Sequence, residues 1–140
     1  MNGSDTSPER DSRLSQVRRI GREHTTSDTD DGWTIRVDGV PFTGEVVDTE
    51  DGRVVGVTTY RDGLEHGPSV EYFPDGDKHV AGQSAEGYAV GEWWEWYPGG
   101  KLKSYKVLDR WGDPRRSQRW SADGVLIEDS ESQGLHGGEW

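Results

Sequence analysis

Histidine and aspartate are the residue types in this chain that could do chemistry. The sequence has no cysteine, so thiolate metal sites and disulfides are excluded. The four histidines, His24, His66, His79 and His136, form no close pair of the kind that binds a metal, and they are interpreted as isolated surface side chains. Nucleophile, phosphate-loop and dinucleotide motifs are also missing. We therefore predict no catalytic residue, no metal, no cofactor and no enzyme.

The aspartates occur largely before glycine. Asp-Gly pairs stand at 31–32, 38–39, 51–52, 62–63, 75–76 and 123–124. The run 28–32 resembles part of a calcium loop, but it lacks the spacing of an EF-hand. Asp-Gly suits the type I′ hairpin turn, whose two central residues have positive φ. These acids therefore predict hairpin turns. The basic pairs at 18–19 and 115–116 are interpreted as solvated positions, with a local phosphate contact left open.

The turns recur because the chain repeats every 24 residues. Gly52, Gly76, Gly100 and Gly124 keep this spacing without exception. The equivalent of Gly67 in the first repeat, Gly44, comes one residue late, which predicts a bulge or a one-residue insertion. The runs between the turns have strand length. We predict an all-β fold: an elongated, single-layer antiparallel meander of about four 24-residue β-hairpin repeats, with about eight strands.

The repeats divide the chain into three segments. Residues 1–31 are predicted to be a flexible tail, disordered or partly helical, with a short helix possible around 12–22. Residues 32–129 form the repeat domain, and residues 130–140 form a C-terminal tail. Only 29% of the residues are hydrophobic and 31% are charged. This composition is lean for a layered core, but a one-layer sheet needs less apolar material.

Aromatic residues concentrate between 90 and 104. Because side chains alternate along a strand, Val46, Val70 and Trp94 are predicted to share one face with Tyr72, Trp96 and Trp120. Trp94 and Trp96 are interpreted as stabilising that face. The opposite face would receive the candidate partner-binding residues, where Trp93 and Tyr97 could serve either packing or an exposed interface. These candidates are Trp93, Tyr97, Glu71, Phe73 and Glu95, with Arg119 on the same face.

The charge of the chain is strongly negative, −11 in total. Residues 33–140 carry twenty acidic and eleven basic residues, a net charge of −9. No basic patch is present to replace the counterions of phosphate, so nucleic-acid binding is not expected. The acidity would suit a basic partner, or it would serve only solubility. The sequence shows no signal peptide and no apolar run of about 20 residues. We expect a soluble, cytoplasmic protein without membrane association.

The repeat resembles a known family. The stretches Tyr60-Arg-Asp-Gly63 with Gly67, Glu71-Tyr-Phe-Pro-Asp-Gly76 and Gly91-Glu-Trp-Trp-Glu-Trp-Tyr-Pro-Gly-Gly100 are similar to the MORN-repeat variant of bacterial YwqK-like antitoxins. The resemblance covers about 32–129, while the acidic charge and the long tail depart from the family pattern. The resemblance implies stacked hairpins that bind other proteins, and the antitoxin label implies that the bound protein is a toxin encoded nearby. The expected function is an antitoxin or immunity protein for a basic, nuclease-like toxin. The alternative is a scaffold or membrane-associated adaptor.

Overall fold

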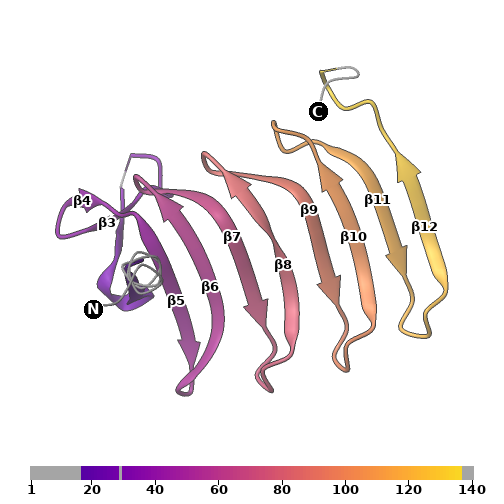
Figure 1. Cartoon of the computed structure of the whole chain (residues 1–140), viewed down its shortest axis with the longest axis horizontal. Helices are drawn as coiled ribbons and strands as arrows, with labels where there is room; N and C mark the ends of the chain where they lie inside the picture. Colours follow the sequence, from indigo (N-terminus) through magenta and orange to yellow (C-terminus); the bar gives the residue numbers. More distant parts are fainter. Residues whose placement is uncertain (1–16, 29, 137–140) are drawn as a thin grey trace, which may run out of the picture.

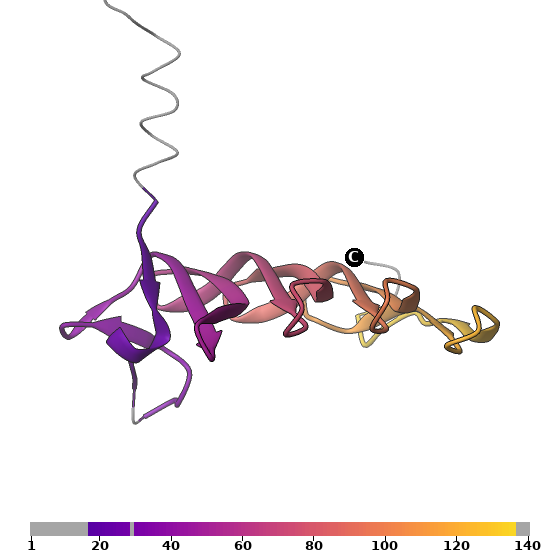
Figure 2. The same cartoon turned by 90° about the horizontal axis from the view of Figure 1, so that it is seen from below.

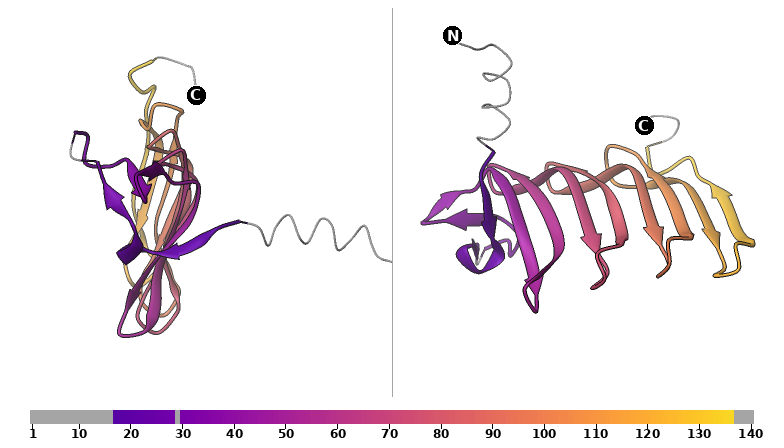
Figure 3. Two further views of the ribbon diagram at one scale, coloured as in Figure 1. Left: turned by 90° about the vertical axis from the view of Figure 1, so that its left-hand side faces the viewer. Right: turned by 60° about the horizontal axis from the view of Figure 1, so that its bottom comes forward.

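The structure, a computed structural model, describes residues 17–28 and 30–136, and this part of the chain is nearly all β (Figure 1). Eight strands follow one another in an antiparallel meander, each paired with its neighbour in sequence. This confirms the predicted all-β hairpin meander. The ribbon is elongated and one layer thick over most of its length (Figures 2 and 3). Its strands are β5 (Gly44–Glu50), β6 (Arg53–Arg61), β7 (Leu64–Tyr72), β8 (Lys78–Ala85), β9 (Tyr88–Trp96), β10 (Leu102–Leu108), β11 (Pro114–Trp120) and β12 (Leu126–Glu131).

The N-terminal end of the ribbon is capped by residues of the predicted tail together with the first residues of the predicted repeat domain. Strand β1 (Arg19–Gly21) pairs in parallel with β5, and the 3₁₀ turn η1 (Arg22–His24) follows it. Strands β2 (Thr26–Ser27), β3 (Ile35–Val37) and β4 (Val40–Pro41) form a separate small sheet beside β5 (Figure 3, left). The tail prediction is thus wrong for the described residues before 32. The rest of that segment, residues 1–16, lies outside the described residues.

The hydrophobic core lies at this capped end. Ile35, Phe42, Val46 and Tyr60 are buried together, and Ile20 and Val37 pack against them. Here the small sheet of β2, β3 and β4 supplies a second layer, while β1 extends the main sheet beside β5; among the described residues, the ribbon from β7 onward has no such layer. Arg22 closes the cluster, because its guanidinium bonds to both Asp48 carboxylate oxygens at 2.9 and 3.1 Å and to the Tyr60 hydroxyl at 3.0 Å.

We call the ends of the sheet after β5, β7, β9 and β11 the lower rim, and those after β6, β8 and β10 the upper rim, as they stand in Figure 1.

The hairpins close in two ways. At 51–52 and 62–63 both Asp and Gly have positive φ, as predicted for type I′ turns. Glu86-Gly87 adopts the same positive φ values.

The Asp-Gly pairs at 75–76 and 123–124 differ from the prediction. Only the glycine has positive φ there. The N–H of Gly76 donates to the Phe73 carbonyl at 2.9 Å, and the Phe73 N–H donates to the Asp77 carbonyl at 2.8 Å. This is a three-residue loop in which a β-turn precedes a left-handed glycine. Pro74 suits its first position because the ring fixes φ near the value required.

The strand register defines two faces. One row of cross-strand partners runs through the whole sheet on what we call the Trp94 face: Val47, Val57, Val70, Ala81, Trp94, Tyr105, Gln118 and Asp129. Val46 was predicted to share this face, and that prediction is wrong. The one-residue delay of Gly44 shifts β5 by one position, so Val47 takes the place of Val46. A slip of one residue exchanges the faces of a strand.

The C-terminal end is closed by a buried ion pair. Asp109 is 2% exposed and Arg115 is 4% exposed, and an oxygen of the Asp109 carboxylate lies 3.5 Å from Nη1 of Arg115. Arg115 Nε donates to the Ser132 carbonyl at 3.0 Å, so the segment after β12 returns over the pair. The solvated position predicted for Arg115 is therefore wrong. The predicted boundary at 129 is also early, because β12 ends at Glu131; residues 137–140 lie outside the described residues.

Candidate protein-binding face

The candidate residues lie on one side of the sheet, which we call the Trp93 face. A register row on it joins Glu71, Val80, Glu95, Ser104 and Arg119 across β7 to β11. Trp93 stands two residues before Glu95 and pairs with Lys106. The predicted shared face of Glu71, Trp93, Glu95 and Arg119 is thus what the register shows.

Glu95 connects the remaining candidates through its neighbours. The Phe73 and His79 rings stack with centroids 4.2 Å apart, and His79 Nε2 lies 3.6 Å from Glu95 Oε2. Lys103 Nζ lies 3.5 Å from the same oxygen and 5.5 Å from the centroid of the Tyr97 ring. A band of alternating aromatic and charged groups therefore crosses the lower half of this face. All of these side chains are half-buried, so the band remains accessible.

Trp93 also has a packing role. Its indole lies over Gly82, which has no side chain to occupy that space. Its Nε1 is within 3.1 Å of the Gln83 and Val90 carbonyl oxygens and donates to both. The ring is half-buried by these contacts. Its remaining surface lines a groove of about 370 Å³ together with Val80, Glu95, Ser104, Lys106 and Leu108.

Tyr97 ties two repeats together. Its hydroxyl donates to the Trp120 carbonyl oxygen at 2.9 Å, from the turn after β9 to the end of β11. This bond fixes the ring at the lower rim. The structure therefore gives both Trp93 and Tyr97 a packing contact and leaves part of each ring at the surface.

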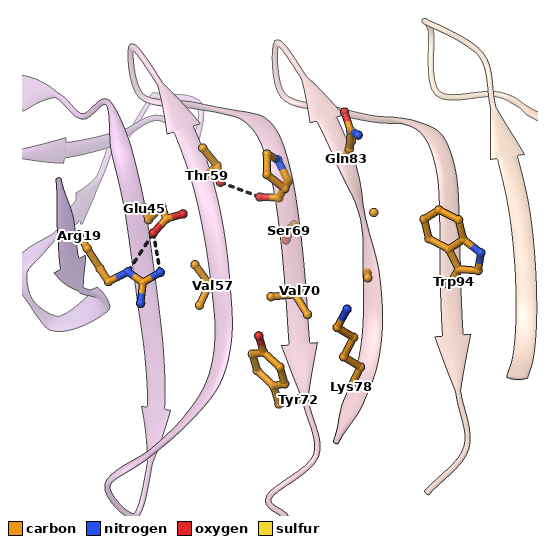
Figure 4. Close-up of a pocket in the computed structure, with 13 residues that line it drawn as sticks. Arg19, Glu45, Val57, Thr59, Ser69, Val70, Tyr72, Lys78, Gln83 and Trp94 are labelled. Atoms are coloured by element: carbon orange, nitrogen blue, oxygen red, sulfur yellow. Dashed lines mark hydrogen bonds and ion pairs between the residues drawn. The ribbon is translucent and has the colours of Figure 1, made fainter. Parts of the chain in front are cut away.

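The Trp94 face carries a second groove, which the sequence did not single out. Ala81 leaves a gap between Val70 and Trp94, and Tyr72 borders it below (Figure 4). The groove has a volume of about 370 Å³, and the Arg19–Glu45 ion pair at 2.7 Å lies at its N-terminal end. The sequence does carry a signal for this groove: at the 24-residue spacing, the small Ala81 stands between the larger Val57 and Tyr105.

An acid–phenol contact lies further along the Trp94 face. The Tyr105 hydroxyl donates to Glu92 Oε2 at 2.6 Å, and its ring lies 5.9 Å from that of Trp94. The hydrogen bond to Glu92, together with burial, raises the pKa of Tyr105 above its usual value. The phenol is therefore a neutral donor at physiological pH, suited to holding Glu92 in place.

Most of the acids without a basic partner lie on the rims. On the faces, Glu45, Asp48, Glu95, Glu128, Asp129 and Glu131 each have a basic partner within 3.5 Å. The rims expose eight acids, accompanied by Arg53, Arg61, Lys78, Lys101 and Arg110. A basic partner would therefore meet the strongest negative potential along the edges of the ribbon. These rim acids are Glu50, Asp51, Asp62, Glu65, Asp75, Asp77, Glu86 and Asp123.

Neither a metal site nor a membrane-spanning helix is found in the described part of the chain. Residues 17–28 and 30–136 contain no group of three or more His, Asp or Glu side chains placed to hold a metal ion. The same residues include no helix long and apolar enough to cross a membrane. Comparisons with protein-family models, with curated proteins and with solved structures find no match.

Proposed function

We propose that the chain is a non-catalytic, cytoplasmic protein-binding repeat domain, and that it acts as a bacterial antitoxin or immunity protein toward a basic toxin. The observation that carries the proposal is the open sheet. From β7 to β12 no second layer in the described part of the chain covers either face. Each face nevertheless carries half-buried aromatic rings and a groove of about 370 Å³. Partly exposed aromatic surface of this kind is typical of protein interfaces.

The arrangement of charge supports a basic partner. Acidic rims on both sides of an aromatic face would attract a positively charged surface and orient it before contact. A nuclease-like toxin has such a surface where it binds phosphate. The aromatic band between Phe73 and Tyr97 would then supply the apolar contact at the centre of the interface.

Co-expression of the chain with the product of the adjacent gene tests the proposal. We expect that product to arrest growth alone and to be neutralised when both are made. A neighbouring product that is harmless, or toxic and not rescued, would refute the antitoxin function.

Charge-reversal variants locate the interface without disturbing the packing of Trp93. Glu71→Lys changes an exposed side chain in the middle of the Trp93 face, and Glu50→Lys makes the same change at the lower rim, away from both grooves. If the Trp93 face binds the partner, Glu71→Lys should weaken capture at least tenfold more than Glu50→Lys. Equal effects would mean that binding follows net charge alone.

The second candidate is a scaffold or membrane-associated adaptor, which the elongated shape favours (Figure 2). A membrane surface of anionic lipid would repel the acidic rims. Flotation with vesicles of neutral lipid and with vesicles containing anionic lipid distinguishes the two functions. Binding to either vesicle would favour the adaptor, and absence of binding to both would favour the protein partner.

A further inference from the structure

The last strand leaves one edge of the ribbon open. The sheet order ends at β12, and no strand among the described residues pairs with its far side. All six residues of β12 are exposed. At the other end, β1 covers the edge of β5. An uncovered edge presents unpaired backbone N–H and C=O groups, which can template another strand.

The direction of these groups follows from the pairing with β11. The Ser132 N–H donates to the Arg115 carbonyl at 3.0 Å, one step beyond the register pair of Glu131 and Arg116. In an antiparallel ladder, alternate residues direct their backbone groups toward and away from the partner strand. Ser130 and Ser132 therefore direct their backbone N–H and C=O groups toward β11, while Asp129 and Glu131 direct theirs outward.

The charge of β12 indicates what kind of strand would pair with it. Its three charged residues are acids, and its inner partner β11 is basic, with three arginines and no acid. Arg116 contacts Asp129 at 3.2 Å and Glu131 at 3.0 Å, and Arg119 contacts Glu128 at 3.3 Å. Within the chain itself, the acids of β12 thus form ion pairs with arginines spaced along the neighbouring strand.

A second copy of the chain suits this edge poorly. Two β12 strands paired antiparallel through their outward groups, centred on Asp129, would set the Asp129 carboxylates of the two copies opposite each other. Like charges directly opposite one another destabilise a strand pair. Leu126 and Ile127 are 45% and 50% exposed beside these acids, so the edge also offers apolar contact to a strand of the opposite charge.

We infer that the outer edge of β12 docks an extended, basic segment of the partner protein, added as a further strand of the sheet. The inference rests on the proposed protein-binding function and names the mode of contact. Backbone pairing at Asp129 and Glu131 supplies the attachment, and Arg or Lys side chains of the incoming segment face the acids of β12. A groove of about 430 Å³ that includes Glu131 and Leu135 lies beside the upper end of the strand and would receive a terminal side chain.

A synthetic peptide with the β11 sequence, residues 114–120, is the probe. A matched peptide carries glutamate in place of its three arginines. We expect the arginine peptide to bind the full chain, to bind more weakly as salt rises, and to slow hydrogen exchange at the Asp129 and Glu131 amides. The β11 amides should keep their protection, because the peptide adds to the edge and does not replace β11. Equal binding of the glutamate peptide would overturn the charge requirement.

Two variants separate the backbone from the charge. Asp129→Pro removes an outward N–H, and proline is tolerated on an edge strand; we expect at least a tenfold loss of peptide binding. Asp129→Asn keeps the N–H and should weaken binding less. Asp38→Asn, the same change at the exposed turn between β3 and β4, should alter it less than twofold. Unchanged binding by Asp129→Pro would overturn the inference.

Two further readouts keep the test decisive. If Asp129→Pro fails to fold, peptide binding to the wild-type chain without added protection at Asp129 and Glu131 overturns the inference. Sedimentation that shows a dimer dissociated by Asp129→Pro would assign the edge to a second copy and would also overturn it. Failure of the edge leaves the co-expression result untouched, so the two proposals can fail separately.

Discussion

The indole of Trp93 occupies the space above Gly82 on the neighbouring strand, where a Cβ would overlap its ring atoms. The pair stands where the register of β8 and β9 shifts, between Ala81 and Gln83. Gly82 is buried and its φ is not positive, so its small size matters here and its backbone freedom does not. The aromatic run is thus anchored in the sheet by a glycine of the preceding strand.

Gly82→Ala should destabilise the protein through this contact. Forcing a methyl group into a filled site typically costs about 1–3 kcal/mol, and we expect a loss of that size in the free energy of unfolding measured with urea. Gly56→Ala is the matched control, because the nearest atom to its Cβ would lie 3.5 Å away, an ordinary contact. Trp93→Leu should reduce the cost of Gly82→Ala in a double-mutant cycle. Additive losses would contradict the proposed overlap.

The one-residue shift of β5 predicts opposite outcomes for adjacent valines. Val46 is 0% exposed in the core beside Phe42, so Val46→Ala should cost about 1.5–3 kcal/mol of unfolding free energy. Val47 is half-buried on the open Trp94 face, and Val47→Ala should cost less than about 1 kcal/mol. Thermal and urea unfolding of the two variants check this order. The reverse order would support the predicted placement of Val46 on the Trp94 face.

The meander could be predicted because its determinants are local. A left-handed residue is needed at each hairpin turn, and glycine supplies it wherever it recurs, as at Gly52 and Gly76. Alternation then placed Glu71, Trp93 and Glu95 on one face correctly. Val46 lies on the other face because the delay of Gly44 shifts the strand that follows by one residue, which strict 24-residue spacing does not take into account.

The two ends of the ribbon could not be predicted in the same way. The pairing of β1 with β5 brings Arg19 next to Glu45, 26 positions later, and no repeat or turn in the sequence predicts it. The sequence predicts a solvated Arg115, because arginine is rarely buried unless it is paired. Its partner Asp109 lies across a turn, and the cover over both comes from the chain after β12.

Acid should weaken the C-terminal closure through Asp109. Burial acts to raise the pKa of this carboxyl, but the N–H donors of Asp113 and Trp111 and the Arg115 guanidinium outweigh it, so the pKa is lowered below 3.8. With the folded pKa depressed, the carboxylate stabilises the fold above about pH 3.8, and this stabilisation is lost as the pH falls toward the folded pKa. Asp109→Asn should therefore be less stable than the wild type at pH 7, with the difference shrinking below pH 4.

The control for Asp109 is Asp123→Asn, the same change at an exposed turn of the lower rim. It should leave stability within about 0.5 kcal/mol of the wild type at pH 7. Urea unfolding at several pH values measures all three proteins. A constant difference between wild type and Asp109→Asn from pH 7 to pH 2 would show that the charge of Asp109 is not what stabilises the closure.

Alkaline titration should report the contact between Tyr105 and Glu92. Because the hydrogen bond to Glu92 raises the pKa of Tyr105 above 10.0, the neutral phenol stabilises the fold at neutral pH, and this contribution is lost as the pH rises through the raised pKa. Glu92→Gln removes the negative charge and keeps an acceptor oxygen, so Tyr105 should ionise at a lower pH in the variant. The ultraviolet absorbance of tyrosinate, with Tyr105→Phe subtracted to isolate the residue, measures the shift. An unchanged midpoint in Glu92→Gln would show that the carboxylate does not control the phenol.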